Sequence, residues 1–85
     1  MKELVVLTRK DCPYCASVRD NIKKVLQENP GFSHIAVTVM DEDDPRAENL
    51  DHYYAPAFFA GDVRISEGNG GAEAVFSAFE TVMKS

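Results

Sequence analysis

Hydrophobic and polar residues follow one another along this chain with a spacing that changes from segment to segment. Leu4 to Leu7 is a continuous apolar run with two β-branched residues, which predicts a strand buried on both faces and therefore central in a sheet. The segment 13–28 predicts a helix, because its apolar residues recur at helical spacing: Cys15, Val18, Ile22, Val25 and Leu26. Polar and charged residues fill the opposite face, and Asn29-Pro30-Gly31 ends the helix.

The next segments predict a second strand and a short helix. Residues 34–40 alternate, with Ile35, Val37 and Val39 on one side, which is typical of a strand. Asp44 followed by proline resembles an N-cap and a first helical position, so a short helix is expected over 45–51.

The last third of the chain predicts a hairpin and a final helix. Strands are expected over 57–60 and 63–66, joined by the turn Gly61-Asp62 and therefore antiparallel. A helix over 72–83 would bury four apolar residues: Val75, Phe76, Phe79 and Val82. The whole order predicts one α/β domain over residues 1–85, with a four-stranded mixed sheet flanked by three helices.

Composition and charge narrow the function classes. Hydrophobic residues make up 45% of the 85 residues, which is a globular composition, and the formal net charge is −5. The nine Lys and Arg residues form no basic run, so we expect neither nucleic acid nor an anionic membrane surface as a partner. The run Leu4 to Leu7 is too short for a signal-peptide core, so a cytoplasmic location is expected. We also expect a monomer.

Cys12 and Cys15 are the candidate catalytic residues. Cys12 falls at the start of the predicted helix, where backbone N–H groups and the helix dipole stabilise a thiolate, so the pKa of Cys12 should fall. Cys15 lies one turn further, on the apolar stripe, and should be more buried. Cys12 can then attack a disulfide, and Cys15 can resolve the mixed disulfide. Arg9 and Lys10 would assist the thiolate, whereas Asp11 would oppose it; which effect is larger stays open.

Structural and metal-binding alternatives fit these cysteines less well. A bridge between them closes a very small loop, which restricts the unfolded chain little. A zinc site would need two more ligands, and neither His34 nor His52 has ligand spacing to the pair, so no metal is expected.

The run Cys12-Pro13-Tyr14-Cys15 after a strand resembles the active site of glutaredoxins, within the thioredoxin superfamily. The resemblance covers most of the chain and implies the minimal thioredoxin fold. It implies that Pro56, in Tyr54-Ala55-Pro56, is the family's cis-proline facing the cysteines. Ala55 would then pair its backbone with a bound thiol compound.

The resemblance also implies a glutathione site. Arg9, three positions before the first cysteine, and Tyr14 would contact glutathione, and Gly70-Gly71-Ala72-Glu73 would hold its γ-glutamyl end through Gly71 and Glu73. The chain departs from the family where Ala74 replaces a second acid, where Tyr54-Ala55 replaces Thr-Val, and where Asp11 precedes the first cysteine. The segment between Pro56 and Gly70 is also longer.

The sequence therefore predicts a glutaredoxin-like thiol–disulfide oxidoreductase without a tightly bound cofactor. Its substrates would be protein or small-molecule disulfides, and its reductant glutathione or a thioredoxin-reductase-type flavoenzyme. An alternative is a module that binds an iron–sulfur cluster through the same motif.

Two further groups have alternative roles. The acidic run 41–44 lacks the glycine and the ligand spacing of a calcium loop, so we expect a solvated helix start. Phe58 and Phe59 point to opposite faces of their strand, and both would be buried if both faces are covered. Tyr54 could pack or could contact substrate, since binding residues favour loops.

Overall fold

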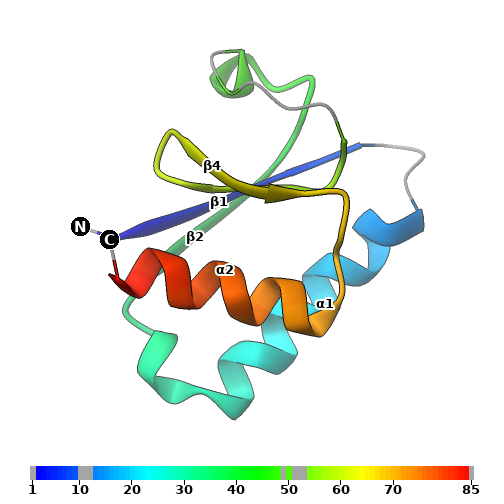
Figure 1. Ribbon diagram of the computed structural model, residues 1–85. Helices are drawn as coiled ribbons and strands as arrows, with labels where there is room; N and C mark the ends of the chain where they lie inside the picture. The colour runs from blue at the N-terminus through cyan, green and yellow to red at the C-terminus, as the bar shows by residue number, and fades with distance from the viewer. Residues whose placement is uncertain (1, 10–12, 49, 51–53, 85) are drawn as a thin grey trace.

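The strands form one mixed sheet of order β2-β1-β3-β4 (Figure 1). The computed structural model describes residues 2–9, 13–48, 50 and 54–84, except for the side chains of 13–16. β1 (Glu3–Thr8) lies in the middle, parallel to β2 (Ala36–Asp41) and antiparallel to β3 (Ala57–Ala60). β4 (Val63–Glu67) continues the sheet antiparallel to β3. The predicted central position of the first strand is confirmed.

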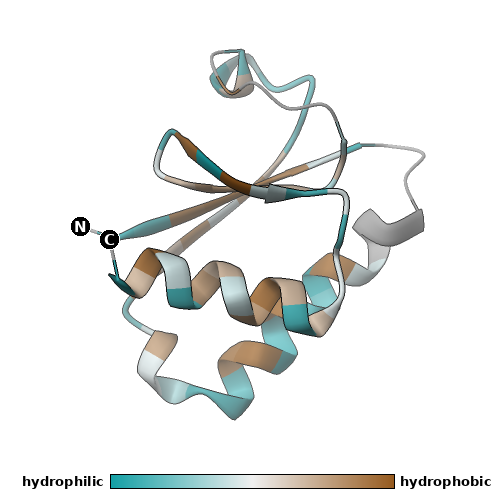
Figure 2. Cartoon of the chain, viewed as in Figure 1, coloured by the Kyte–Doolittle hydropathy of each residue, from teal (hydrophilic) through white to brown (hydrophobic). Residues whose placement is uncertain are grey.

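Two α-helices pack on one face of this sheet. They are α1 (Pro13–Glu28) and α2 (Ala72–Lys84), and apolar and polar bands alternate along both (Figure 2). The predicted stripes are buried against β1 and β3 in one cluster, which we call the helix-side core: Leu4, Val6, Val18, Ile22, Val25, Ile35, Phe58, Val75, Ala78, Phe79 and Val82. Phe76 and Leu26 are only partly buried at its margin.

The opposite face has a thinner cover. Its core, which we call the loop-side core, is a smaller cluster against which Leu50 packs: Val5, Leu7, Met40, Ala47, Ala57 and Phe59. Phe58 and Phe59 are thus both buried, one on each face, as predicted. A register shift lies between them in the pairing of β3 with β4, which the sequence did not indicate.

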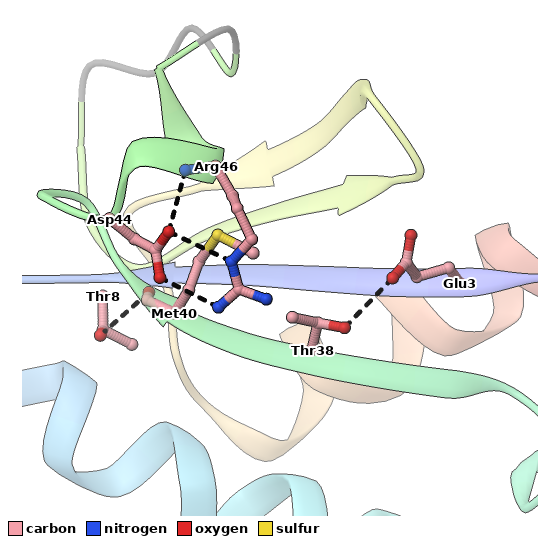
Figure 3. Close-up of polar contacts among 6 residues, drawn as sticks. All are labelled: Glu3, Thr8, Thr38, Met40, Asp44 and Arg46. Carbon is pink, nitrogen blue, oxygen red and sulfur yellow. Dashed lines mark hydrogen bonds and ion pairs between the residues drawn. The ribbon is translucent and has the colours of Figure 1, made fainter.

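The predicted count of three helices is not confirmed. Within the described residues the segment 45–51 contains one 3-10 turn, η2 (Pro45–Ala47), on the loop side of the sheet. Asp44 caps it as expected, because its side chain accepts a hydrogen bond from the Arg46 N–H at 2.9 Å (Figure 3). Ala47 is the one residue of η2 that is buried, so the turn has little apolar surface with which to continue as a helix.

Other boundaries differ by a residue or two. A second 3-10 turn, η1 (Pro30–Phe32), follows α1, and the second strand accordingly begins at Ala36 rather than at residue 34. The fourth strand and the last helix each end one residue later than predicted. At the end of α2, Lys2 Nζ donates a hydrogen bond to the Met83 carbonyl, so the two ends of the chain lie together (Figure 1).

Candidate functional site

Three strands bring part of the predicted site to one edge of the sheet. Thr8 pairs with Asp41 at the C-terminal ends of the parallel strands β1 and β2. Leu7 pairs with Ala57, so β3 begins at the same edge. The connection that carries Cys12 joins Thr8 to the start of α1 and therefore begins here. Cys12 and the side chains of Tyr14 and Cys15 lie outside the described part of the structure.

The start of α1 agrees with the sequence prediction. The helix begins at Pro13, the residue after Cys12, and its first turn contains no acidic residue. Backbone N–H groups of a first helical turn have no partner within the helix, and the dipole is positive there. Val18 and Ile22 are buried in the helix-side core, so the apolar stripe of α1 fixes the helix against the sheet.

The loop before β3 is the second part of the site. The Ala55–Pro56 peptide bond is cis, as predicted, and Pro56 is buried. The Pro56 carbonyl accepts a hydrogen bond from the Gly68 N–H at 2.8 Å. The Tyr54 N–H donates to Glu67 Oε2 at 3.2 Å. Two hydrogen bonds therefore tie this loop to the end of β4, while the Tyr54 side chain is exposed.

Arg9 lies at the same edge, and its side chain forms an ion pair with Glu42. Its Nε donates to Glu42 Oε1 at 2.8 Å, and the Glu42 N–H donates to the Thr8 carbonyl at 2.8 Å. Arg9 follows β1 and Glu42 follows β2, so the parallel register places them side by side. The acidic run is thus more than a solvated helix start: Glu42 pairs with Arg9, and Asp44 caps η2.

Asp41, at the end of β2, was not singled out by sequence reasoning. Its Oδ1 is buried without a hydrogen-bond partner among the described residues. The neighbouring Thr8 hydroxyl donates to the Met40 carbonyl at 3.3 Å (Figure 3). Four consecutive acidic residues give no sequence signal that a carboxylate oxygen of one of them is buried. Asp41 lies where it does because it pairs with Thr8 at the ends of β2 and β1.

The glycine segment is held by its own neighbours. Gly70 is buried, and its carbonyl accepts a hydrogen bond from Asn21 Nδ2 at 2.7 Å. The Gly71 N–H donates to Asn69 Oδ1 at 2.9 Å. The first bond joins the segment to the middle of α1, and the second is formed within the segment.

Glu73 lies away from the start of α1. It lines a shallow groove between the two helices, formed by Val25, Glu28, Asn29, Ala72, Glu73, Phe76 and Ser77. Val25 follows Cys15 by almost three turns, which is about 15 Å along a helix axis. The structure therefore gathers Arg9, Ala55 and Pro56 at the edge where α1 begins, and places Glu73 towards the other end of that helix.

No metal site or membrane span is found among the described residues. They contain no group of three or more His, Cys, Asp or Glu side chains that could hold an ion. His34 is exposed, and His52 lies outside the described residues. In the same part of the chain, no helix is both long and apolar enough to cross a bilayer.

Comparisons with known proteins support the fold. No protein-family model matches the chain. No curated protein matches it either. Among solved structures it is similar to human ERp44 in its zinc-bound form, with a TM-score of 0.64, 13% identity and 94% of this chain covered. It is also similar to the J-Trx1 fragment of ERdj5, with a TM-score of 0.59, 17% identity and 96% covered. The chain spans only 26% and 43% of the length of those two chains. The similarity over most of this chain shows that it has a thioredoxin fold.

Proposed function

We propose that this chain is a glutaredoxin-like thiol–disulfide oxidoreductase with Cys12 as nucleophile and Cys15 as resolving thiol. The observation that supports this most is the start of α1 at Pro13, directly after Cys12, at the edge that also carries the cis peptide bond before Pro56. A thiolate at this position would gain from the N–H groups and the positive dipole end of a first helical turn, which favour the nucleophilic form of a thiol.

The reaction proceeds by two exchanges. The Cys12 thiolate attacks one sulfur of a substrate disulfide, forming a mixed disulfide and releasing the other sulfur as a thiolate. Cys15 loses its proton and attacks Cys12, which releases the second substrate thiol and leaves a Cys12–Cys15 disulfide. Two electrons from an external dithiol or from two thiol molecules restore the reduced pair. A reducing compartment such as the cytoplasm would keep it reduced.

Substituting each cysteine separately tests this mechanism. Cys12→Ser should abolish disulfide reduction, whereas Cys15→Ser should still attack and should accumulate a mixed disulfide that mass spectrometry detects. Far-UV circular dichroism should show that both variants keep the fold. Equal rates for the wild type and Cys12→Ser would refute the proposal.

We infer further that a thioredoxin-reductase-type flavoenzyme, rather than glutathione, is the reductant. In the family the glycine segment and the basic residue bind glutathione. Here the Gly71 N–H bonds to Asn69, the Arg9 side chain pairs with Glu42, and Glu73 lies towards the far end of α1. Each group already has a protein partner or lies far from the start of α1.

Coupled assays distinguish the two reductants. Reduction of one disulfide substrate should proceed with NADPH and thioredoxin reductase, and should be slow with NADPH, glutathione and glutathione reductase. Faster turnover in the glutathione assay would overturn the inference about the reductant while leaving the dithiol mechanism intact.

An iron–sulfur role is tested separately. Protein purified anaerobically, and again after reconstitution with iron and sulfide, should lack visible absorption from a cluster. A coloured cluster whose formation depends on Cys12 would favour the binding module instead.

A further inference from the structure

Tyr54 is an exposed aromatic side chain at the edge of the proposed redox site. Among the described residues the large hydrophobic side chains with the greatest exposure are Tyr54, at 66%, and Val63, at 65%. Val63 pairs with Ala60, which in turn pairs with Leu4, so Val63 lies at the opposite end of the sheet. Tyr54 precedes the cis peptide bond, at the end where β1 leads into the Cys12 connection.

The backbone of Tyr54 is fixed although its ring is exposed. Its N–H is bonded to Glu67 Oε2, and Glu67 Oε1 lies 3.7 Å from Arg64 Nη1. Gly68 lies beside the base of the side chain, since a Cβ built on Gly68 would be 3.5 Å from Tyr54 Cβ. The Gly68 N–H is itself bonded to the Pro56 carbonyl. The base of the tyrosine is therefore held by β4 and by the loop after it.

An exposed aromatic ring on a backbone that is held in place is suited to binding another apolar side chain. Aromatic residues bury a large area, and tyrosine loses little conformational entropy when it does so. Glutathione carries no apolar side chain to cover this ring. A polypeptide substrate can place a bulky residue beside its reacting cysteine.

We propose that Tyr54 determines specificity for protein disulfides in which an aromatic or large aliphatic residue lies next to the reacting cysteine. This inference rests on the proposed oxidoreductase function. Tyr54 acts by contact with the substrate chain, not on the sulfur atoms, so its effect belongs to KM rather than to kcat.

Two synthetic peptides test the proposal. Each carries one cysteine in disulfide linkage to 5-thio-2-nitrobenzoate, and they differ only in having Phe or Ala beside the cysteine. Attack by Cys12 releases the coloured thiolate. With pre-reduced protein and no added reductant, each molecule reacts once, and the wild type should prefer the Phe peptide about tenfold in the second-order rate constant, mainly through the peptide concentration at half-maximal rate. Tyr54→Ala should reduce this ratio to about one, and Tyr54→Phe should preserve it because the ring remains.

Val63→Ala is the matched control, since it removes an equally exposed apolar side chain far from the site. It should keep both the activity and the peptide preference. An unchanged Phe-to-Ala ratio in Tyr54→Ala, or an equal loss in Val63→Ala, would overturn the role of Tyr54. Failure of the wild type to release the thiolate from either peptide, with Cys12→Ser indistinguishable from it, would instead refute the proposed oxidoreductase.

Discussion

Gly68 has a backbone conformation that side chains rarely adopt. Its φ is +86°, and its N–H is bonded to the Pro56 carbonyl. A Cβ there meets Tyr54 only at ordinary contact distance, so Gly68→Ala should act through backbone strain. We expect its free energy of unfolding to fall by about 1 kcal/mol.

Gly31 provides the control for this prediction. No heavy atom lies within 4 Å of a Cβ built on Gly31, and its φ is not in the left-handed region. Gly31→Ala should leave stability unchanged or raise it by up to about 1 kcal/mol, because alanine restricts the unfolded chain. Urea denaturation of both variants measures the difference. Equal effects would contradict the role assigned to the Gly68 conformation.

Asp44 should titrate below the usual range for an aspartate. Hydrogen bonds from the Arg46 side chain, and then from its backbone N–H, lower the pKa of Asp44. Any stability that this carboxylate contributes is therefore present above its unfolded pKa and is lost as pH falls through the lower folded value. Its side chain is accessible, so screening keeps the contribution small.

NMR titration of the Asp44 carboxyl carbon tests this prediction. Arg46→Ala removes the side-chain hydrogen bonds and should move the pKa of Asp44 up towards its ordinary value. Arg46→Lys keeps the charge but loses the paired contacts of the guanidinium, and should fall between the two. A pKa of Asp44 that is the same in all three proteins would contradict the assignment.

Individual residues were predictable where a local rule decides their state. The Asp44 cap belongs to this class, as do the buried Val18 and Phe79. The cis bond before Pro56 was predicted from the family resemblance instead. Contacts between distant segments were not predictable. The pairing of Arg9 with Glu42 depends on a parallel register that no local pattern encodes.

At the scale of elements, a side chain of α1 is hydrogen-bonded to the glycine segment that precedes α2. Asn21 Nδ2 donates to the carbonyl of the buried Gly70 at 2.7 Å. Asn21→Ala leaves that carbonyl without its partner and should lower the free energy of unfolding by about 1–2 kcal/mol. Gln27→Ala, at an exposed position of the same helix, should change it by less than about 0.5 kcal/mol. A similar loss in both variants, measured by urea denaturation, would contradict this connection.

The type of each long element was predictable from periodicity, and the short ones were less so. The spacing of apolar residues is consistent over the 16 residues of α1 and the 5 residues of β4, and this spacing predicts a helix for one and a strand for the other. The segment 45–51 has a correct start signal but only a single buried residue in its 3-10 turn, so the signal alone overstates its length. The register shift between Phe58 and Phe59 arises from how β4 pairs with β3, which neither strand's own pattern specifies.

At the scale of the whole molecule, the sheet separates two cores that should respond independently. Phe32 and Phe79 stack on the helix side with ring centroids 5.2 Å apart, whereas Phe59 is buried on the loop side. Each Phe→Leu change should lower the free energy of unfolding by about 1 kcal/mol. The pair Phe32→Leu and Phe79→Leu should be coupled by about 0.5–1.5 kcal/mol.

The pair Phe59→Leu and Phe79→Leu provides the comparison across the sheet. Its effects should add to within about 0.5 kcal/mol, because the two side chains lie in separate clusters. Urea denaturation of the single and double variants measures both couplings. Stronger coupling across the sheet than within the stacked pair would contradict the two-core description.

The meeting of the chain ends at Lys2 and Met83 has a practical consequence. β1 runs from this end of the sheet to Thr8, so both ends lie opposite the edge from which the Cys12 connection departs. A tether attached beside Lys2 or beside Lys84 would therefore hold the molecule by the same side. On an electrode or a bead, either tether would present to solution the edge from which the Cys12 connection departs.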